Sequence, residues 1–125
     1  MAVGNDAILN QGTGTIAVNS GTLSGITTLT NTSSSAAAID VASGATLSFG
    51  SLQSSAGTVT VSGTAIVVGP GLLDNQLGST FDLNGAVTGS VNNAGTATIA
   101  GTVSGQIINA LGGVCLLYTS DAADE

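Results

Sequence analysis

The sequence predicts an all-β protein folded as a β-solenoid, with coils of about sixteen residues. The first reason is an internal repeat: residues 85–94 (GAVTGSVNNA) match residues 101–110 (GTVSGQIINA) at an offset of sixteen. The second is alternation, because apolar residues are dispersed singly among Thr, Ser and Gly. The third is side-chain size: aromatic residues make up only 2% of a chain that is 42% hydrophobic. Together these features favour a thin core filled by small branched side chains.

The predicted strands are short, and each places two apolar side chains on one face. In chain order the inward-facing pairs are Ile16/Val18, Leu47/Phe49, Val59/Val61, Phe81/Leu83 and Ala97/Ile99. Gly, Asn and Ser between the pairs supply turns with positive φ. A strand with so few inward residues cannot bury itself alone. We therefore expect successive coils to stack in register around one continuous narrow core.

The repeat predicts which residues lie above one another in successive coils. The aligned positions are Gly85/Gly101, Val87/Val103, Gly89/Gly105, Val91/Ile107 and Asn93/Asn109, preceded by Thr80/Thr96 and Leu83/Ile99. An earlier copy at residues 21–26 lies eighty residues before residues 101–106, which is five times the offset. Looser copies at residues 43–52 and 56–65 fill part of the interval.

The spacing between these copies drifts, and the drift predicts two inserted loops, Ser33–Ala38 and Gly69–Gly78. Each coil of a solenoid adds about 4.8 Å along the axis. We therefore expect about seven coils and a rod segment roughly 30–35 Å long.

An antiparallel β-sandwich of hairpins is the alternative fold. The dipeptide Asn84-Gly85 is a hairpin-turn signal in isolation. Its repeat partner, however, is Ala100-Gly101, so the Asn is not required at that position. A sandwich also has no need of a fixed register of sixteen residues. The solenoid is therefore favoured.

The composition excludes several classes of function. The chain has no Lys, Arg or His, and its seven acidic residues give a formal net charge of −7. Nucleic-acid recognition and most enzyme mechanisms need a cation or an imidazole. We expect no nucleic-acid partner, no catalysis in this segment, and no catalytic, cofactor-binding or metal-binding residues. No stretch is long and apolar enough to predict membrane insertion.

The acidic side chains do not form a recognisable site. Before residue 115, the closest acidic pair is Asp74 and Asp82, eight residues apart, and glycoside hydrolysis requires a matched pair of carboxylates. We expect Asp74 in a turn and Asp82 facing solvent between Phe81 and Leu83, so both have surface roles. The isolated aspartates share no period, which argues against a calcium-binding repeat.

Three polar patterns remain. Asn93 and Asn109 share a repeat position, where stacked Asn side chains can form a hydrogen-bonded ladder that satisfies turn backbone. Asn31-Thr32-Ser33 fits the N-glycosylation sequon.

Threonine arrays on β-solenoids resemble the ice-binding face of some antifreeze proteins, although the aligned Thr80–Asp82 interrupts the array. The Thr-x-Thr pairs are Thr13/Thr15, Thr28/Thr30, Thr58/Thr60 and Thr96/Thr98.

The last eleven residues, Cys115 to Glu125 (CLLYTSDAADE), differ in composition from the rest and hold the only Cys, Tyr and Glu. This string resembles the translation of a transposon-type sequencing adapter. We therefore expect residues 1–114 to be a solenoid repeat fragment, residues 115–125 to be non-native, and the natural chain to continue past Val114. The acidic residues that remain are Asp6, Asp40, Asp74 and Asp82.

The pattern at residues 92–113 (NNAGTATIAGTVSGQIINALGG) resembles the passenger regions of bacterial autotransporters and filamentous-haemagglutinin-like adhesins, and this resemblance of composition and repeat covers most of residues 12–113. Those regions are right-handed parallel β-helices. The resemblance implies an extracellular or cell-surface location, a stalk or adhesive role, and contacts with neighbouring coils of the same chain and with a host or surface ligand through loops. It carries over no functional residue. The alternative functions are a non-catalytic part of a carbohydrate-active β-helix enzyme and an ice-binding solenoid.

Overall fold

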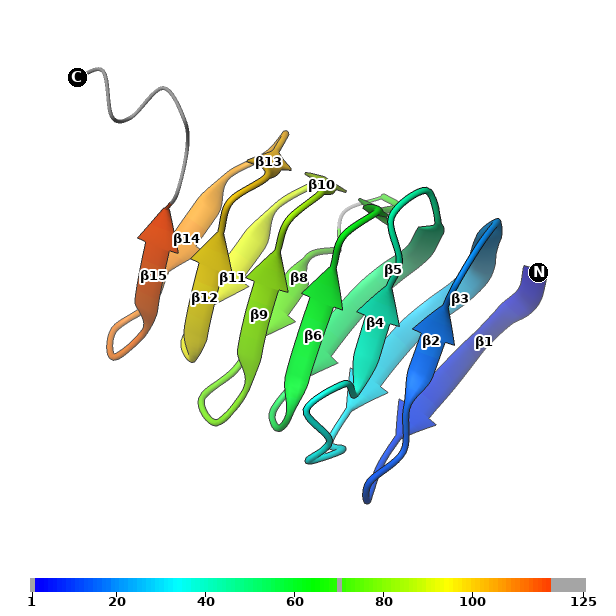
Figure 1. Cartoon of the computed structure of the whole chain (residues 1–125), viewed down its shortest axis with the longest axis horizontal. Helices are drawn as coiled ribbons and strands as arrows, with labels where there is room; N and C mark the ends of the chain where they lie inside the picture. Colours follow the sequence, from blue (N-terminus) through cyan, green and yellow to red (C-terminus); the bar gives the residue numbers. More distant parts are fainter. Residues whose placement is uncertain (1, 70, 118–125) are drawn as a thin grey trace.

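The computed structural model describes residues 2–69 and 71–117, and over these residues it is a β-solenoid of about five turns, about 21 residues apart. The described part contains fifteen strands and no helix (Figure 1). In chain order the strands are β1 (Ala2–Asn10), β2 (Ile16–Val18), β3 (Thr22–Asn31), β4 (Ile39–Val41), β5 (Thr46–Ser54), β6 (Thr58–Val61), β7 (Thr64–Val67), β8 (Leu73–Asn75), β9 (Thr80–Leu83), β10 (Ala86–Thr88), β11 (Val91–Asn93), β12 (Thr96–Ile99), β13 (Thr102–Val103), β14 (Ile107–Asn109) and β15 (Val114–Leu117).

The strands form two parallel sheets that wrap around a common core. Sheet A runs β13-β10-β7-β5-β8-β11-β14, and β1 and β3 join it through β5. Sheet B runs β15-β12-β9-β6-β4-β2. Every strand pair in the described part is parallel, which confirms the solenoid and shows that the antiparallel sandwich is wrong.

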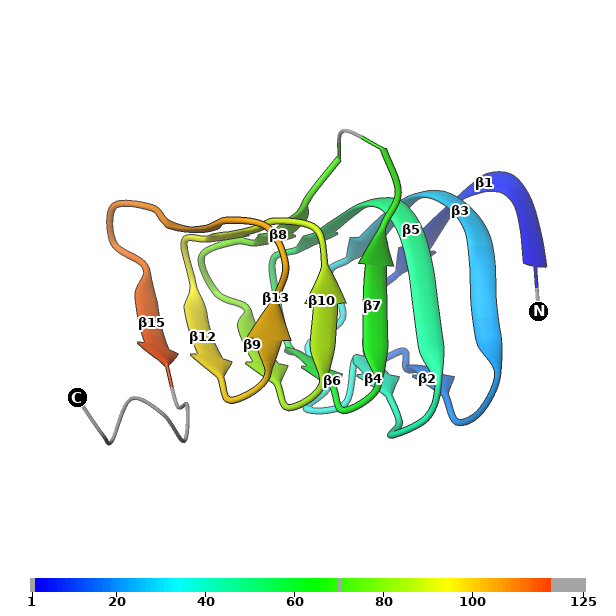
Figure 2. The ribbon, with the colours of Figure 1, turned by 90° about the horizontal axis from the view of Figure 1, so that it is seen from above.

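Each coil has three faces, because sheet A bends. The first half of β5 pairs with β7, with Leu47 opposite Ala65, and its second half pairs with β8, with Leu52 opposite Leu73. The long strands β1, β3 and β5 thus turn a corner as continuous strands, whereas later coils cross the same corner through a loop (Figure 2). Sheet B supplies the third face.

The coils are longer than expected everywhere except at the end of the chain. One column of residues is separated by 21 and 23 residues at its first two steps and by 18 and 16 at its last two. Thr22 and Thr102 do share a column, but only Thr46, Thr64 and Ala86 stand between them, so the interval spans four steps and not five. The predicted seven coils are therefore about five.

Within the final coils the predicted register is confirmed residue by residue. Val87 pairs with Val103, Val91 with Ile107 and Asn93 with Asn109 on sheet A. On sheet B, Thr80 pairs with Thr96 and Leu83 with Ile99. The offset of sixteen therefore describes these coils and not the earlier ones.

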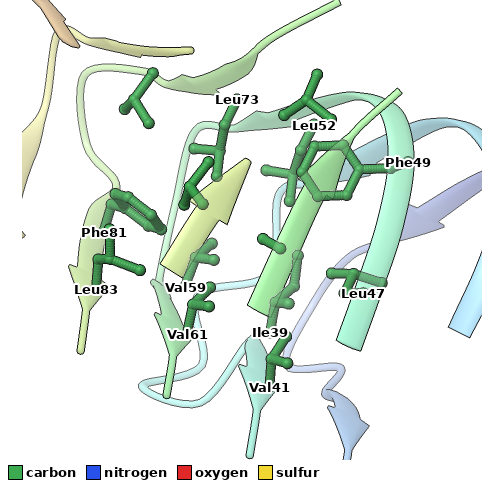
Figure 3. Close-up of a cluster of buried hydrophobic side chains, with 14 of the residues drawn as sticks. Ile39, Val41, Leu47, Phe49, Leu52, Val59, Val61, Leu73, Phe81 and Leu83 are labelled. Atoms are coloured by element: carbon green, nitrogen blue, oxygen red, sulfur yellow. The ribbon is translucent and has the colours of Figure 1, made fainter. Parts of the chain in front are cut away.

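The core is a narrow stack of small and large side chains, as the alternation predicts. All five predicted inward pairs point into it, with Ile16 partly buried at its N-terminal end and the other nine residues buried. Phe81 on sheet B lies between the smaller Val59 and Ala97 of the adjacent coils. Figure 3 shows Phe49 and Phe81 approaching the interior from opposite sheets. Alternating large and small residues along a column allows coils about 4.8 Å apart to pack without voids.

One of the two predicted loops is confirmed, and the other is only partly right. Residues 32–38 form no strand, which agrees with the loop expected at Ser33–Ala38. The loop expected at Gly69–Gly78 ends early, because β8 begins at Leu73 and joins sheet A between β5 and β11. On either side of residue 70, the described parts of the connection between β7 and β8 rise out of the stack in Figure 2. The Gly and Pro residues in this part of the sequence predict a loop, although it contains the buried strand β8.

The repeated glycines lie at the corner between sheet B and sheet A, where neighbouring coils come into close contact. Gly63, Gly85 and Gly101 occupy this corner in successive coils. A Cβ atom on Gly85 would overlap the carbonyl oxygen of Gly63, and one on Gly101 would overlap that of Gly85. The backbones therefore touch along the axis, which explains why the repeat aligns these two glycines.

The beginning of the predicted tail continues the solenoid. Val114–Leu117 forms β15, in which Cys115 pairs with Ala97 and Leu117 with Ile99. Partial burial raises the pKa of the Cys115 thiol. Residues 118–125 lie outside the described residues, and the non-native origin of the tail stays a prediction. Over the described residues no helix could cross a membrane.

Candidate functional site

A row of side chains linked by hydrogen bonds runs along the inside of the solenoid, at the corner where sheet A leads into sheet B. We call it the amide ladder; its members are Asn10, Asn31, Ser54, Asn75, Asn93 and Asn109. Nδ2 of Asn10 donates to Oδ1 of Asn31 at 2.8 Å. Nδ2 of Asn75 donates to Oδ1 of Asn93 at 2.7 Å, and Nδ2 of Asn93 donates to Oδ1 of Asn109 at 2.9 Å.

Each amide also satisfies the carbonyl groups of the neighbouring turns. Nδ2 of Asn93 donates to the carbonyl of Gly95 in its own coil at 3.2 Å and to that of Val114 in the next coil at 2.9 Å. The ladder expected from Asn93 and Asn109 is thus confirmed as a structural element. Asn31 is fully buried in it, so the amide of the predicted glycosylation sequon is already engaged.

Sequence reasoning missed the other members, because their spacing does not follow one period. A usable signal was present: each strand that ends at the ladder reads apolar-x-Asn or apolar-x-Ser, and in all but one case a Gly follows within five residues. These triplets are Ile8–Asn10, Leu29–Asn31, Leu52–Ser54, Leu73–Asn75, Val91–Asn93 and Ile107–Asn109. The Gly requirement is met everywhere except in the longer corner after Asn31.

The ladder has one defect, between Ser54 and Asn75. The short Ser54 side chain accepts from Nδ2 of Asn31 at 3.1 Å, and its Oγ lies 2.7 Å from Oγ of Ser79. It contacts Ser79 of the next coil in this way but makes no hydrogen bond to the Asn75 side chain. Oδ1 of Asn75 is therefore buried without a hydrogen-bond partner, the only such side-chain atom in the described part of the chain. An unsatisfied buried acceptor of this kind lowers stability.

The double variant Ser54→Asn/Ser79→Gly is expected to repair this defect and to raise the free energy of unfolding by about 1 kcal/mol. An Asn at position 54 would place its Nδ2 beside Oδ1 of Asn75. Removing the Ser79 hydroxyl makes room for it, and the corresponding positions in other coils, Gly14 and Gly95, are already glycine. Urea denaturation followed by circular dichroism measures the change.

The two single variants are the controls. Ser54→Asn alone should destabilise, because its amide would overlap the Ser79 hydroxyl, and Ser79→Gly alone should destabilise because Ser54 loses a partner. If the ladder is repaired, the double variant is more stable than the unmodified chain even though each single variant is less stable, so the two changes in the free energy of unfolding do not add. Simple additivity of the two destabilising effects would contradict the proposed cause of the defect.

The aspartates are not brought together. Asp74 is in β8 on sheet A and Asp82 in β9 on sheet B, so they lie on different faces. Asp82 points outward between two buried residues, as expected, but the turn predicted for Asp74 is wrong. The Asp74 carboxylate accepts hydrogen bonds from Nδ2 of Asn92 at 2.9 Å and from Nε2 of Gln76 at 3.1 Å. Among the described residues no acidic or Cys cluster could hold a metal ion.

Part of the predicted threonine array is present on sheet B. Thr58, Thr80 and Thr96 form one outward column on successive coils, and the adjacent column reads Thr60, Asp82, Thr98. None of these five hydroxyl groups has a hydrogen-bond partner among the described residues. The other predicted pairs lie elsewhere, Thr13/Thr15 in the corner before β2 and Thr28/Thr30 on sheet A.

The surface hollows are open and carry few functional groups. Two adjoining hollows, of about 250 and 480 Å³, share Thr27, Gly50 and Val68 at the corner beside the β7–β8 loop. A third, of about 220 Å³, follows β2 and is lined by residues 17–20, 22 and 23. The side chains that line them are hydroxyl, amide or aliphatic groups, which suit weak polar contacts.

Comparison of the chain with protein-family models, with curated proteins and with solved structures gave no significant match.

Proposed function

We propose that this chain is a structural rod segment, a spacer within a larger secreted or surface-anchored bacterial protein. The observation that carries the proposal is the continuity of the inward columns. On sheet B the column Ile39–Val59–Phe81–Ala97 runs through successive coils without a polar residue, and the amide ladder runs beside it. The apolar core and the amide ladder both run along the solenoid axis, so each coil mainly adds length to the rod.

The outward positions support the same assignment. They hold mostly Thr, Ser and Asn, which keep a rod hydrated without creating a single binding surface. The resemblance of residues 92–113 to autotransporter and haemagglutinin-like passenger regions supports a location at a bacterial surface. In this proposal adhesion to a host or surface ligand belongs to loops or to other parts of the larger protein, and this segment determines their distance from the cell.

Duplicating one coil should lengthen the rod by one step. Residues 76–93 form an in-register unit, because Asn75 and Asn93 are ladder neighbours 18 residues apart. Spin labels at the exposed corners, Thr13→Cys and Leu111→Cys in a Cys115→Ser background, would lie about five steps or 24 Å apart along the axis. Duplicating residues 76–93 should increase the distance measured by double electron–electron resonance to about 29 Å.

A duplication of residues 76–84 alone is the matched control. It inserts half a coil, breaks the column register, and should abolish the cooperative thermal transition. An unchanged label distance after the in-register duplication would contradict the rod proposal. Saturable binding of the isolated chain to a glycan array would instead place adhesion within this segment.

A second candidate function, ice binding, is favoured by the threonine columns of β6, β9 and β12. Their hydroxyl groups form a grid of about 4.8 Å along the axis and about 6.6 Å along each strand. Asp82 is the single interruption among six positions. A regular array of hydroxyl and methyl groups can hold water in an ordered layer.

Asp82→Thr should complete this grid and raise thermal hysteresis above that of the unmodified chain. Asp74→Thr makes the same change of charge on the other sheet and should have no effect. Hysteresis is measured on single ice crystals in dilute protein. If both the unmodified chain and Asp82→Thr lack activity, this candidate fails and the spacer proposal is untouched.

A further inference from the structure

The corner between β9 and β10 carries an asparagine that the fold does not require. Asn84 is the only asparagine in the sequence that is followed by glycine. The same corner position is occupied by Ser62 in the preceding coil and by Ala100 in the next, with the same backbone hydrogen bonds. The corner therefore forms without an amide side chain, and the Asn-Gly pair is not explained by folding.

The Asn84 side chain is exposed, and its amide makes no hydrogen bond to any described residue. Other asparagines differ in this respect: Nδ2 of Asn93 makes three hydrogen bonds, and that of Asn92 bonds to Asp74. Among the asparagines whose side chains the structure describes, Asn19 is the only other one with a free amide, and it is followed by serine. The Asn84 amide can therefore turn toward its own backbone, whereas the amides of the ladder cannot.

A free amide before glycine allows a reaction within the chain. The backbone nitrogen of Gly85 can attack Cγ of Asn84, and the closure forms a five-membered succinimide ring. The Cγ–Nδ2 bond breaks, and Nδ2 leaves as ammonia with the proton that the Gly85 nitrogen gives up. Water then adds to one of the two ring carbonyls and opens the ring, which yields aspartate or isoaspartate at position 84. Glycine favours the attack because it has no side chain beside its nitrogen.

A shared hydrogen bond restrains this reaction in the folded chain. The carbonyl of Val61 in the preceding coil accepts from the N–H of Asn84 at 2.8 Å and from that of Gly85 at 3.0 Å. The Gly85 nitrogen must lose its proton to attack, and its N–H is engaged while the corner is closed. We therefore expect the ring to close only when the corner opens locally. Amide hydrogen exchange at Gly85 requires the same opening.

One of the two products does not fit the closed corner. Isoaspartate carries the main chain through its Cβ atom, so it adds one carbon to the backbone before Gly85. Even a Cβ atom on Gly85 would overlap the carbonyl oxygens of Gly63 and Ser62. An additional main-chain atom beside this contact must displace Gly85 from the preceding coil. Aspartate changes the charge and leaves the path of the backbone intact.

We propose that Asn84-Gly85 is a site of spontaneous deamidation, at which the folded rod modifies itself. The hydrogen bonds to the Val61 carbonyl set the rate, because they determine how often the corner opens. Conversion to isoaspartate then loosens the contact between two coils without cutting the chain. The only co-reactant is water, and the loss of ammonia makes the step irreversible.

The test is ageing of the full 125-residue chain at neutral pH. Mass spectrometry of peptic peptides, with electron-transfer fragmentation to separate aspartate from isoaspartate, follows each asparagine. Deamidation should accumulate at Asn84, while the ladder residue Asn93 stays unmodified. Asn84→Gln is the matched control, because it keeps an exposed amide at the corner but would have to close a six-membered ring. Deamidation at position 84 should be at least about tenfold slower in this variant.

The Phe81→Leu variant tests the restraint, because it weakens packing in the strand that leads into the corner. When the corner opens and closes faster than either reaction proceeds, both rates are proportional to the fraction of open corner. Deamidation at Asn84 and hydrogen exchange at Gly85 should therefore accelerate by the same factor, at least about fivefold. Urea below the unfolding transition supplies the same comparison in the unmodified chain, should Phe81→Leu fold poorly.

Moving the pair to the next coil tests whether the corner itself determines the rate. In the double variant Asn84→Ala/Ala100→Asn the asparagine precedes Gly101. There the carbonyl of Leu83 accepts from the N–H of residue 100 at 2.8 Å and from that of Gly101 at 3.2 Å. Deamidation should disappear from position 84 and occur at position 100, at a rate within about tenfold of the original.

The Asn84→Asp variant separates the effect of charge from that of the backbone. It carries the carboxylate of one product without the additional main-chain carbon, so it should melt like the unmodified chain. The isoaspartate form, purified from the aged chain by ion-exchange chromatography, should melt lower by about 4 °C or more.

Three results would overturn the proposal. If ageing modifies Asn19 or a ladder asparagine and leaves Asn84 intact, the corner is not the reactive site. If Phe81→Leu accelerates hydrogen exchange at Gly85 but not deamidation, the shared hydrogen bond does not control the reaction. If the isoaspartate form melts at the same temperature as Asn84→Asp, the corner accommodates the additional carbon and the modification does not loosen the rod.

Discussion

The Phe81→Ala variant is expected to lose about 3–5 kcal/mol of stability, which is enough to unfold most of the protein at 25 °C. Phe81 is fully buried in β9, and its ring fills the space between Val59 and Ala97 of the adjacent coils. Those two side chains are small and their backbones are held by the sheet, so the cavity cannot collapse. Urea denaturation monitored by circular dichroism measures the loss.

Two further variants separate cavity formation from other causes. Phe81→Leu keeps most of the volume and should cost less than half as much as Phe81→Ala. Thr80→Ala changes the outward neighbour on the same strand and should shift stability by less than about 0.5 kcal/mol. Equal losses for Phe81→Ala and Phe81→Leu would argue against a tightly packed core at this position.

Asn93→Ala should destabilise the protein by about 3 kcal/mol even though it removes only a few atoms. The variant deprives the carbonyls of Gly95 and Val114 of their side-chain donor, and it leaves Oδ1 of Asn109 without its bond. Asn75 loses an acceptor as well. Leaving buried polar groups unpaired costs more than the bonds contributed, so the loss should exceed that of an ordinary surface Asn.

Asn92→Ala provides the matched control for this prediction. Asn92 is the preceding residue of β11, but its side chain faces outward and donates one bond, to Asp74. Its loss should cost under about 1 kcal/mol. Thermal melting of both variants at one pH gives the comparison, and similar melting temperatures would show that the ladder is not a stabilising element.

The strand pairs and the core could be predicted from the sequence because alternation encodes them locally. Phe81 and Leu83 flank an outward Asp, and Val59 and Val61 flank an outward Thr, so the inward face is unambiguous. Coil length could not be predicted in the same way. It depends on the corners, and the corners at residues 32–38 and between β7 and β8 admit extra residues without disturbing any column.

The same reasoning explains which part of the site was found. Asn93 and Asn109 belong to the final coils, where the corners are short and the offset is constant. Asn31 and Asn75 perform the same role but are displaced in the sequence by longer corners. The turn-like sequence of residues 70–78 (PGLLDNQLG) predicts a turn at Asp74, although β8 is fixed by its pairing with β5 and β11. Long-range pairing overrode the local turn signal.

The corners of this solenoid differ in length while the inward residues of successive coils stay aligned, and this property is useful in protein engineering. In one coil β7 ends at Val67 and β8 begins at Leu73, and the neighbouring coils make the same connection with different numbers of residues. A foreign peptide inserted between these two strands would thus leave every inward column in place. It would be carried on the outside of the rod, so the solenoid can serve as a display scaffold whose cargo is chosen separately from its fold.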